Sequence, residues 1–160
     1  MAYFKLTHIH VVSLLLAFLC LLPKSTIAQS ITFKQSLASE VLQDSVLSAF
    51  YKERGYKSLW MGSSANERER LSALIMAFSQ AEIHGLPAKL FSATDLQRKI
   101  TQAKTDRQRG AIEAQLTLKF LKYVSVVRSG ILVPSEVDKE IVRKVPRPNY
   151  KAILSKLTQR

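Results

Sequence analysis

Residues 50–60 read FYKERGYKSLW and place four aromatic rings around one glycine, Gly55: those of Phe50, Tyr51, Tyr56 and Trp60. An aromatic side chain buries roughly 150–250 Å², so the stretch predicts the seed of a hydrophobic core. Glycine readily takes the left-handed conformation that ends a helix. We therefore expect a helix that ends at Gly55, followed by a segment whose aromatic side chains are buried in the core. A ligand groove lined by exposed rings is the alternative, but large aromatic side chains are mostly buried.

The whole chain has 160 residues, of which 47% are hydrophobic, and a formal net charge of +12 at pH 7. This length fits one domain with one core. The charge indicates anionic partners, which are nucleic acids, phospholipid head groups or the carboxylates and phosphates of a cell envelope. The location of the protein decides among them.

Residues 1–28 have the three parts of a secretory signal: a short polar segment with Lys5, an apolar run at 9–22, and small residues before Ala28. We expect cleavage after Ala28, a periplasmic location and a domain over 29–160. An uncleaved anchor is the alternative. Because a membrane span needs about 20 apolar residues, we expect membrane contact only transiently, through the signal peptide.

Removal of residues 1–28 takes away Lys5, Lys24 and no acid, which lowers the net charge from +12 to +10, and it also removes Cys20, the only cysteine. The exported chain then has no disulfide and must rely on an ordinary hydrophobic core. Export also argues against nucleic acid as the partner.

The remaining pattern predicts a mainly α fold, a single compact helical domain with a long central helix and at most short strands. After a polar lead-in at 31–39, one apolar face predicts the first helix: Leu42, Val46, Ala49 and Phe50. Residues 57–61 are expected to be extended. The pairs Ser64 with Glu67, Thr94 with Gln97 and Thr105 with Gln108 match the capping box that begins a helix.

The second helix should bury Leu71, Leu74, Ile75 and Phe78 and end at Gly85. Residues 111–128 are apolar around most of a helix, which is typical of a central helix. Gly130 should end it, Pro134 should begin a short segment, and 131–133 reads as strand. A last helix follows through Ile153, Leu154 and Leu157. The predicted core joins Phe50, Tyr56, Trp60, Leu74, Phe78, Phe120 and Val124.

Catalytic chemistry finds little support in residues 29–160. They contain no thiol for cysteine catalysis, no G-x-S-x-G turn and a single histidine, His84. A zinc site commonly needs three or four ligands, and we expect His84 to cap a helix end instead. The sequence thus predicts no catalytic residue, no metal and no cofactor, and a protein that is not an enzyme on its own.

Basic residues gather in two places and are the candidate anion-binding residues. One cluster flanks a helix junction: Arg98, Lys99, Lys104, Arg107 and Arg109. The other follows the long helix: Lys139, Arg143, Lys144 and Arg147. The alternative is that both are solvated faces, as most charge runs are.

Three motifs in this order carry a family resemblance: FYKERGYKSLW, HGL at 84–86, and LTLKFLKYVSVVRSG at 116–130 followed by Pro134. The set resembles the N-terminal scaffold domain of the large, multidomain periplasmic murein L,D-transpeptidases. The motif residues are Phe50, Tyr51, Arg54, Tyr56, Leu59, Trp60, His84, Gly85, Leu86, Gly130 and Pro134. Ser58 departs from the proline usual in that family, and Pro87 to Lys89 stand where an acid is common.

The resemblance implies a non-catalytic scaffold-domain protein, truncated or split, associated with peptidoglycan cross-linking and cell-wall organisation. The family's catalytic histidine and its Ser-x-Gly-Cys segment have no counterpart here. The implied partners are peptidoglycan or another anionic envelope polymer, and a catalytic transpeptidase. The alternative is an unrelated basic periplasmic helical module that binds anionic envelope polymers or a protein partner.

Overall fold

The computed structural model describes residues 26–131, 146 and 148–159. These ranges hold six α-helices and one 3₁₀ turn: α2 (Thr26–Val41), α3 (Ser45–Glu53), α4 (Ala65–Ser79), η1 (Glu82–His84), α5 (Ala93–Gln102), α6 (Asp106–Ser129) and α8 (Tyr150–Thr158). No strand occurs in them. The prediction of a compact, mainly α fold is confirmed.

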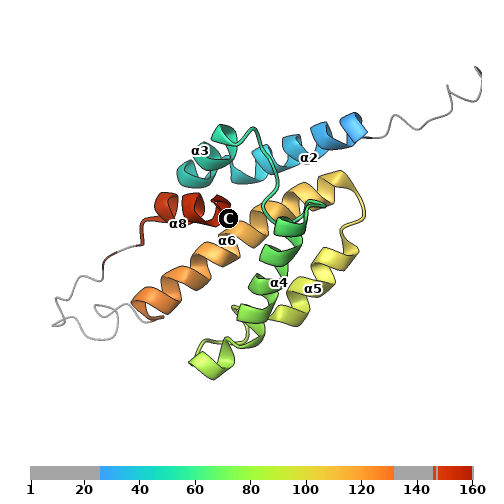
Figure 1. The fold of residues 1–160 in the computed structure, drawn as a ribbon. Coiled ribbons are helices and arrows are strands. Elements are labelled where there is room, and N and C mark those ends of the chain that lie inside the picture. Colours follow the sequence, from blue (N-terminus) through green and yellow to red (C-terminus); the bar gives the residue numbers. More distant parts are fainter. Residues whose placement is uncertain (1–25, 132–145, 147, 160) are drawn as a thin grey trace, which may run out of the picture.

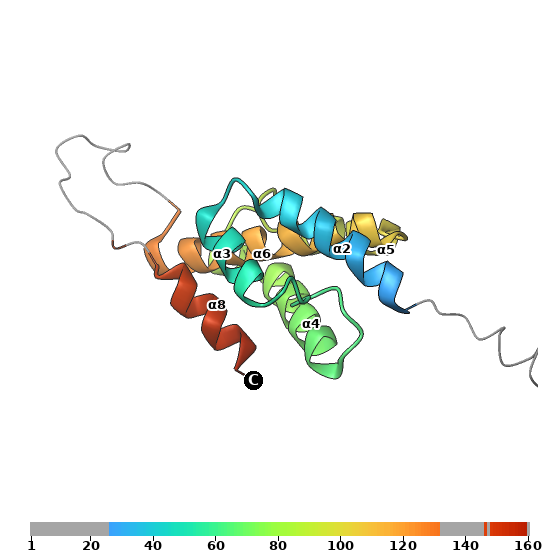
Figure 2. The same cartoon turned by 90° about the horizontal axis from the view of Figure 1, so that it is seen from above.

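Helix α6 is the long central helix, and the other helices surround it (Figure 1). Helices α2 and α3 lie along one side of it, and α4 and α5 lie along another. The view from above places α4 and α8 on the same side of α6 (Figure 2). Gly130, with φ of 79°, follows the last residue of α6 as predicted.

The N-terminal helices differ from the prediction. Residues 31–39, expected as a polar lead-in, belong to α2. Asp44 then begins α3, because its carboxylate accepts hydrogen bonds from two backbone N–H groups of the first turn, both at 3.0 Å. This break splits the predicted apolar face, and Leu42, Val46 and Ala49 are exposed. Helix α3 instead buries Leu47, Phe50 and Tyr51.

The end of α3 matches the prediction. The N–H of Gly55 donates to the carbonyl of Lys52 at 3.0 Å, and that of Tyr56 donates to the carbonyl of Tyr51 at 2.8 Å. These two bonds form a Schellman motif. Gly55 and Tyr56 both have positive φ, 60° and 57°. A left-handed residue with a side chain costs roughly 1–2 kcal/mol, so Tyr56 is strained.

Two of the three predicted capping boxes are confirmed, those of Ser64 with Glu67 at α4 and of Thr105 with Gln108 at α6. The third is wrong, because Ser92 caps α5 by accepting from the N–H of Asp95 at 3.1 Å. Gly85, with φ of 71°, caps η1, whereas α4 already ends at Ser79. Residues 57–61, expected as extended, form an irregular loop with bends.

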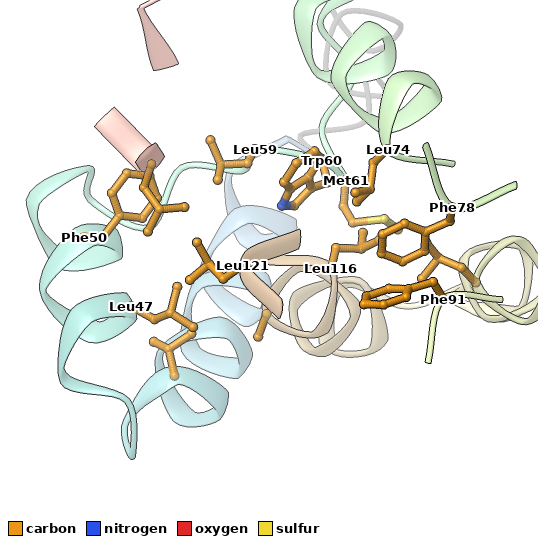
Figure 3. Packing of buried hydrophobic residues seen from close by; sticks show 14 of the residues in the cluster. Leu47, Phe50, Leu59, Trp60, Met61, Leu74, Phe78, Phe91, Leu116 and Leu121 are labelled. Carbon is orange, nitrogen blue, oxygen red and sulfur yellow. The ribbon is translucent and has the colours of Figure 1, made fainter. Parts of the chain in front are cut away.

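Buried aromatic and aliphatic side chains fill the space around α6 (Figure 3). The rings of Trp60 and Phe120 lie 5.6 Å apart. The predicted core is confirmed for six of its seven residues: Phe50, Trp60, Leu74 and Phe78 are buried in it, and the half-buried Tyr56 and Phe120 pack against it. Val124 is half-buried but lies outside this cluster. A second aromatic group was not predicted, in which Phe78, Phe91 and Tyr123 have ring centroids 5.3–5.5 Å apart.

Helix α8 covers this core at the C-terminal end and buries Leu154, as predicted. Its first turn is capped by Asn149, whose side-chain oxygen accepts from the N–H of Ala152 at 3.0 Å. The predicted segment at Pro134, the strand at 131–133 beyond Ile131, and most of the predicted signal peptide lie outside the described residues.

Helices α2 and α6 approach closely at Gly110. A Cβ atom built on Gly110 would lie 2.5 Å from the carbonyl oxygen of Phe33 and 2.9 Å from Cβ of Ser36. The first of these atoms is backbone and cannot turn away. The Ser36 hydroxyl also donates to the carbonyl of Arg107 at 2.7 Å. The absence of a side chain at Gly110 therefore sets the distance between the two helices.

We predict that Gly110→Ala lowers the free energy of unfolding by about 1–3 kcal/mol, because α2 must shift to admit the methyl group. Ordinary helix propensity acts the other way and favours alanine by about 1 kcal/mol. Urea denaturation measures the balance. Ala111→Gly, one residue further along α6, is the matched control. Its free energy of unfolding should fall only by the difference in helix propensity, about 1 kcal/mol. If Gly110→Ala is more stable than wild type, α2 does not pack there.

Candidate functional site

The irregular loop 58–61 wraps around one buried carboxylate, that of Glu113 on α6. Glu113 is 0% exposed. Its Oε1 accepts from the N–H of Leu59 at 2.6 Å, and its Oε2 accepts from the N–H groups of Trp60 at 3.2 Å and Met61 at 2.9 Å. The Ser58 hydroxyl donates to Oε2 at 2.8 Å. The carboxylate thus replaces the partners that a helix or sheet would give these amides.

Glu113 also belongs to a hydrogen-bond network with Tyr51 and Thr117. The Tyr51 hydroxyl donates to Oε1 at 2.8 Å and lies 2.6 Å from Oγ1 of Thr117. The indole N–H of Trp60 donates to that same Oγ1 at 2.8 Å. Thr117 is 0% exposed, like Glu113. Buried polar groups that are fully paired fix one packing arrangement, so this network joins α3, the loop and α6.

Three arginines from different parts of the chain bind the carbonyl groups of the same loop. Arg54, which follows α3, donates to the carbonyl of Ser58 at 3.5 Å. Arg70 of α4 donates to that of Leu59 at 3.1 Å, and Arg109 of α6 donates to that of Met61. The N–H groups of the loop therefore face one carboxylate, and its carbonyl groups face three guanidinium groups.

The network raises the pKa of Tyr51 well above its ordinary value of 10.0. Burial is the main cause, and the negative charge of Glu113 is the second. Ionisation of the phenol would remove the proton that Tyr51 donates to Glu113 and place two charges side by side. Tyr51 is therefore a neutral hydrogen-bond donor of the folded protein.

Sequence reasoning missed Glu113 and Thr117. Both lie on the long helix, which was predicted from its apolar residues. Their spacing of four places them on one face of α6, next to the fully buried Leu116. A polar pair at this spacing inside an apolar face is the signal that could have found them.

A polar depression with a volume of about 840 Å³ opens beside the loop. Its walls come from α2, the 54–64 connection, the first two turns of α4, the first turn of α6 and the last residue of α8. Five cationic side chains line it: Lys34, Arg54, Lys57, Arg70 and Arg109. We call it the basic depression. A second, mostly apolar groove of about 500 Å³ lies between α4, α6 and α8 and includes Phe120, Tyr123 and Leu157. Arg70 lines both hollows.

The candidate anion-binding cluster at 98–109 is dispersed. Arg98 and Lys99 both pair with Asp95, the latter at 3.4 Å, and the hydrogen bond from Arg98 holds the pKa of Asp95 below its usual value. Arg109 faces the basic depression. Lys104 and Arg107 are exposed. The candidates of the other cluster, Lys139, Arg143, Lys144 and Arg147, lie outside the described residues.

The motif residues of the aromatic stretch are brought together. Tyr51, Leu59 and Trp60 are buried at 2% exposure or less, which favours the core over the exposed-ring interpretation. The Arg54 guanidinium lies 5.4 Å from the ring centroid of Phe50. At the other end of α4, Leu86 is buried, whereas His84 and Gly85 are exposed at η1. Pro134 lies outside the described residues.

The described ranges hold no group of three histidine, cysteine or acidic side chains able to bind a metal ion. In the part of the chain that the structure describes, no helix is both long enough and apolar enough to cross a membrane.

Comparison with known families gives one match, to the family described as the scaffold domain, over residues 45–160. The chain belongs to the scaffold-domain family. The match begins at the first residue of α3, so α2 precedes it. No curated protein and no solved structure matches the chain. Within the matched part lie the whole Glu113 network and four of the five cations of the basic depression, Lys34 being the exception.

We predict that Glu113→Gln destabilises this scaffold domain by about 2–4 kcal/mol, because an amide nitrogen replaces one acceptor oxygen and faces donors that it cannot satisfy. Urea denaturation measures the loss. Glu40→Gln, an exposed acid-to-amide change on α2, is the control and should stay within about 0.5 kcal/mol of wild type. Equal effects of the two substitutions would contradict a central role for Glu113.

We also predict an alkaline instability that depends on Tyr51. The folded-state pKa lies above the unfolded value near 10.0, so the stabilisation is complete below pH 10. Above it, the unfolded state releases a proton that the folded state keeps, and stability falls by about 1.4 kcal/mol per pH unit until the folded-state pKa is reached. In denaturation experiments between pH 8 and 11, the free energy of unfolding of wild type should fall relative to that of Tyr51→Phe as the pH rises. A constant difference between the two would contradict the raised pKa.

Proposed function

We propose that this scaffold-domain protein acts as a non-catalytic, wall-associated module of the L,D-transpeptidase type in the periplasm. It holds peptidoglycan, or another anionic envelope polymer, near a separate catalytic transpeptidase. The family match over residues 45–160 is the observation that carries the proposal. The ordered motifs at 50–60, 84–86 and 116–130 support the link to transpeptidases by resemblance.

Two further features support the proposal. Transpeptidation of this type forms an acyl-enzyme on a cysteine, and the only cysteine, Cys20, lies in the predicted signal peptide. The net charge of +10 predicted after export suits a polymer that carries free stem-peptide carboxylates. The protein would therefore contribute binding and position, and its partner would contribute the nucleophile.

The test is retention on isolated sacculi of the full chain, expressed with residues 1–28 so that the host can export it. We expect retention at 0.1 M salt and release at 1 M, where the Debye length falls from roughly 10 Å to about 3 Å. Sacculi whose carboxylates have been amidated are the matched control and should retain little protein.

The same preparation, incubated with tetrapeptide muropeptides, should give no cross-linked product by mass spectrometry. Absence of retention at low salt would refute the wall-associated function. Cross-linked product from the purified chain would refute its non-catalytic character.

A further inference from the structure

The basic depression carries more positive charge than its surroundings neutralise. Its walls hold five cations and two acids, Glu67 and Asp106, and the buried Glu113 lies under its loop. Glu67 is engaged with Ser64, whose N–H and hydroxyl donate to it at 2.9 and 2.6 Å. Within the part of the chain that the structure describes, carboxylate ion pairs occur only at Asp95. The five cations of the depression therefore have no carboxylate partner there.

Two of these cations are already oriented. Arg70 and Arg109 each use a guanidinium N–H on a loop carbonyl, and an arginine has five such donors. The anchored groups keep donors for a ligand, and they lose less side-chain entropy on binding than free arginines would. Guanidinium forks bind carboxylates and phosphates in the same bidentate way.

The guanidinium group of Arg54 has hydrogen-bond donors that its neighbours only partly satisfy. Its Nε is the one buried side-chain nitrogen or oxygen atom without a hydrogen-bond partner in the described ranges. The hydrogen bond that Arg54 donates to the Ser58 carbonyl is long at 3.5 Å. Among the hydrogen bonds from the three arginines to the loop carbonyls, that of Arg54 is therefore the longest.

The size of the depression indicates the kind of ligand. A volume of about 840 Å³ is far larger than the roughly 30 Å³ that one water occupies, and it lies within the roughly 300–1,000 Å³ typical of ligand sites. A single small ion would leave most of the depression empty. A ligand with several anionic groups along a chain could contact the separate cations at once.

We propose that the basic depression is an oxyanion-binding site for an acidic peptide that carries several carboxylates, such as a peptidoglycan stem peptide. The proposal rests on the proposed function for the source of the ligand. The proposed site differs from the 98–109 cluster that the sequence indicated, because the two sets of cations share only Arg109.

Two matched double variants separate the surfaces. Lys34→Gln with Lys57→Gln removes two exposed cations from the depression, and Lys104→Gln with Arg107→Gln removes two exposed cations outside it. Each pair lowers the net charge by the same amount. None of the four side chains belongs to the buried network, so both variants should fold.

The measurement is an NMR titration of backbone amides with a soluble tetrapeptide muropeptide at 0.1 M salt. We expect shifts at Lys57, Gly62 and Ser63, and a Kd that rises roughly three- to tenfold in the depression variant, because each exposed charge contact contributes only a modest energy. The Kd of the outside variant should stay within about twofold of wild type. Equal weakening of both variants, or shifts confined to other amides, would overturn the site.

Two further arms identify the anion and separate this proposal from the proposed function. The amidated muropeptide should not bind, and inorganic phosphate should bind more weakly at the same amides. Binding of phosphate alone would overturn the peptide assignment. Sacculus retention without muropeptide shifts in the depression would overturn the site and leave the wall-associated function standing, whereas loss of both would refute both.

Discussion

The fold depends on the bond between the Glu113 carboxylate and the backbone of loop 58–61. A buried carboxylate costs several kcal/mol unless hydrogen bonds compensate it. Here three amide N–H groups and two hydroxyl groups, those of Tyr51 and Ser58, supply that compensation. The loop has no regular secondary structure, so the acid and the loop amides satisfy each other. Either one alone would be a buried polar group without a partner.

The same arrangement couples the core to the surface. The N–H groups of the loop point inward to Glu113, and its carbonyls bind Arg54, Arg70 and Arg109. The inner acid fixes the loop, and the loop in turn fixes guanidinium groups that line the basic depression. A substitution at Glu113 should therefore disturb the positions of these guanidinium groups as well as stability. Tyr56, which has a strained φ of 57° and also lines the depression, lies two residues before Ser58, the first residue of this loop.

Local patterns predicted much of the fold, and long-range contacts account for what they missed. The capping boxes at Ser64 and Thr105 depend on residues three apart, and both were found from sequence. The break at Asp44 was missed because its apolar neighbours also fit one continuous helix. Glu113 was missed because its partners Tyr51 and Leu59 are 62 and 54 residues away. The basic depression gathers cations from four separate segments, which no linear cluster could indicate.

Helix α2 shows how packing can extend a domain beyond its recognisable motif. The family match begins at Ser45, yet α2 lies before it and packs on α6 through Gly110. At that contact the backbone carbonyl of Phe33 lies against the position where Gly110 has no side chain. Helix α2 also buries Leu37 and Val41 in the core, at 0% and 1% exposure, so its packing depends on apolar side chains as well as on this close approach. Lys34, one residue after Phe33, lines the basic depression, so the close approach at Gly110 also brings a cation of α2 to the proposed site.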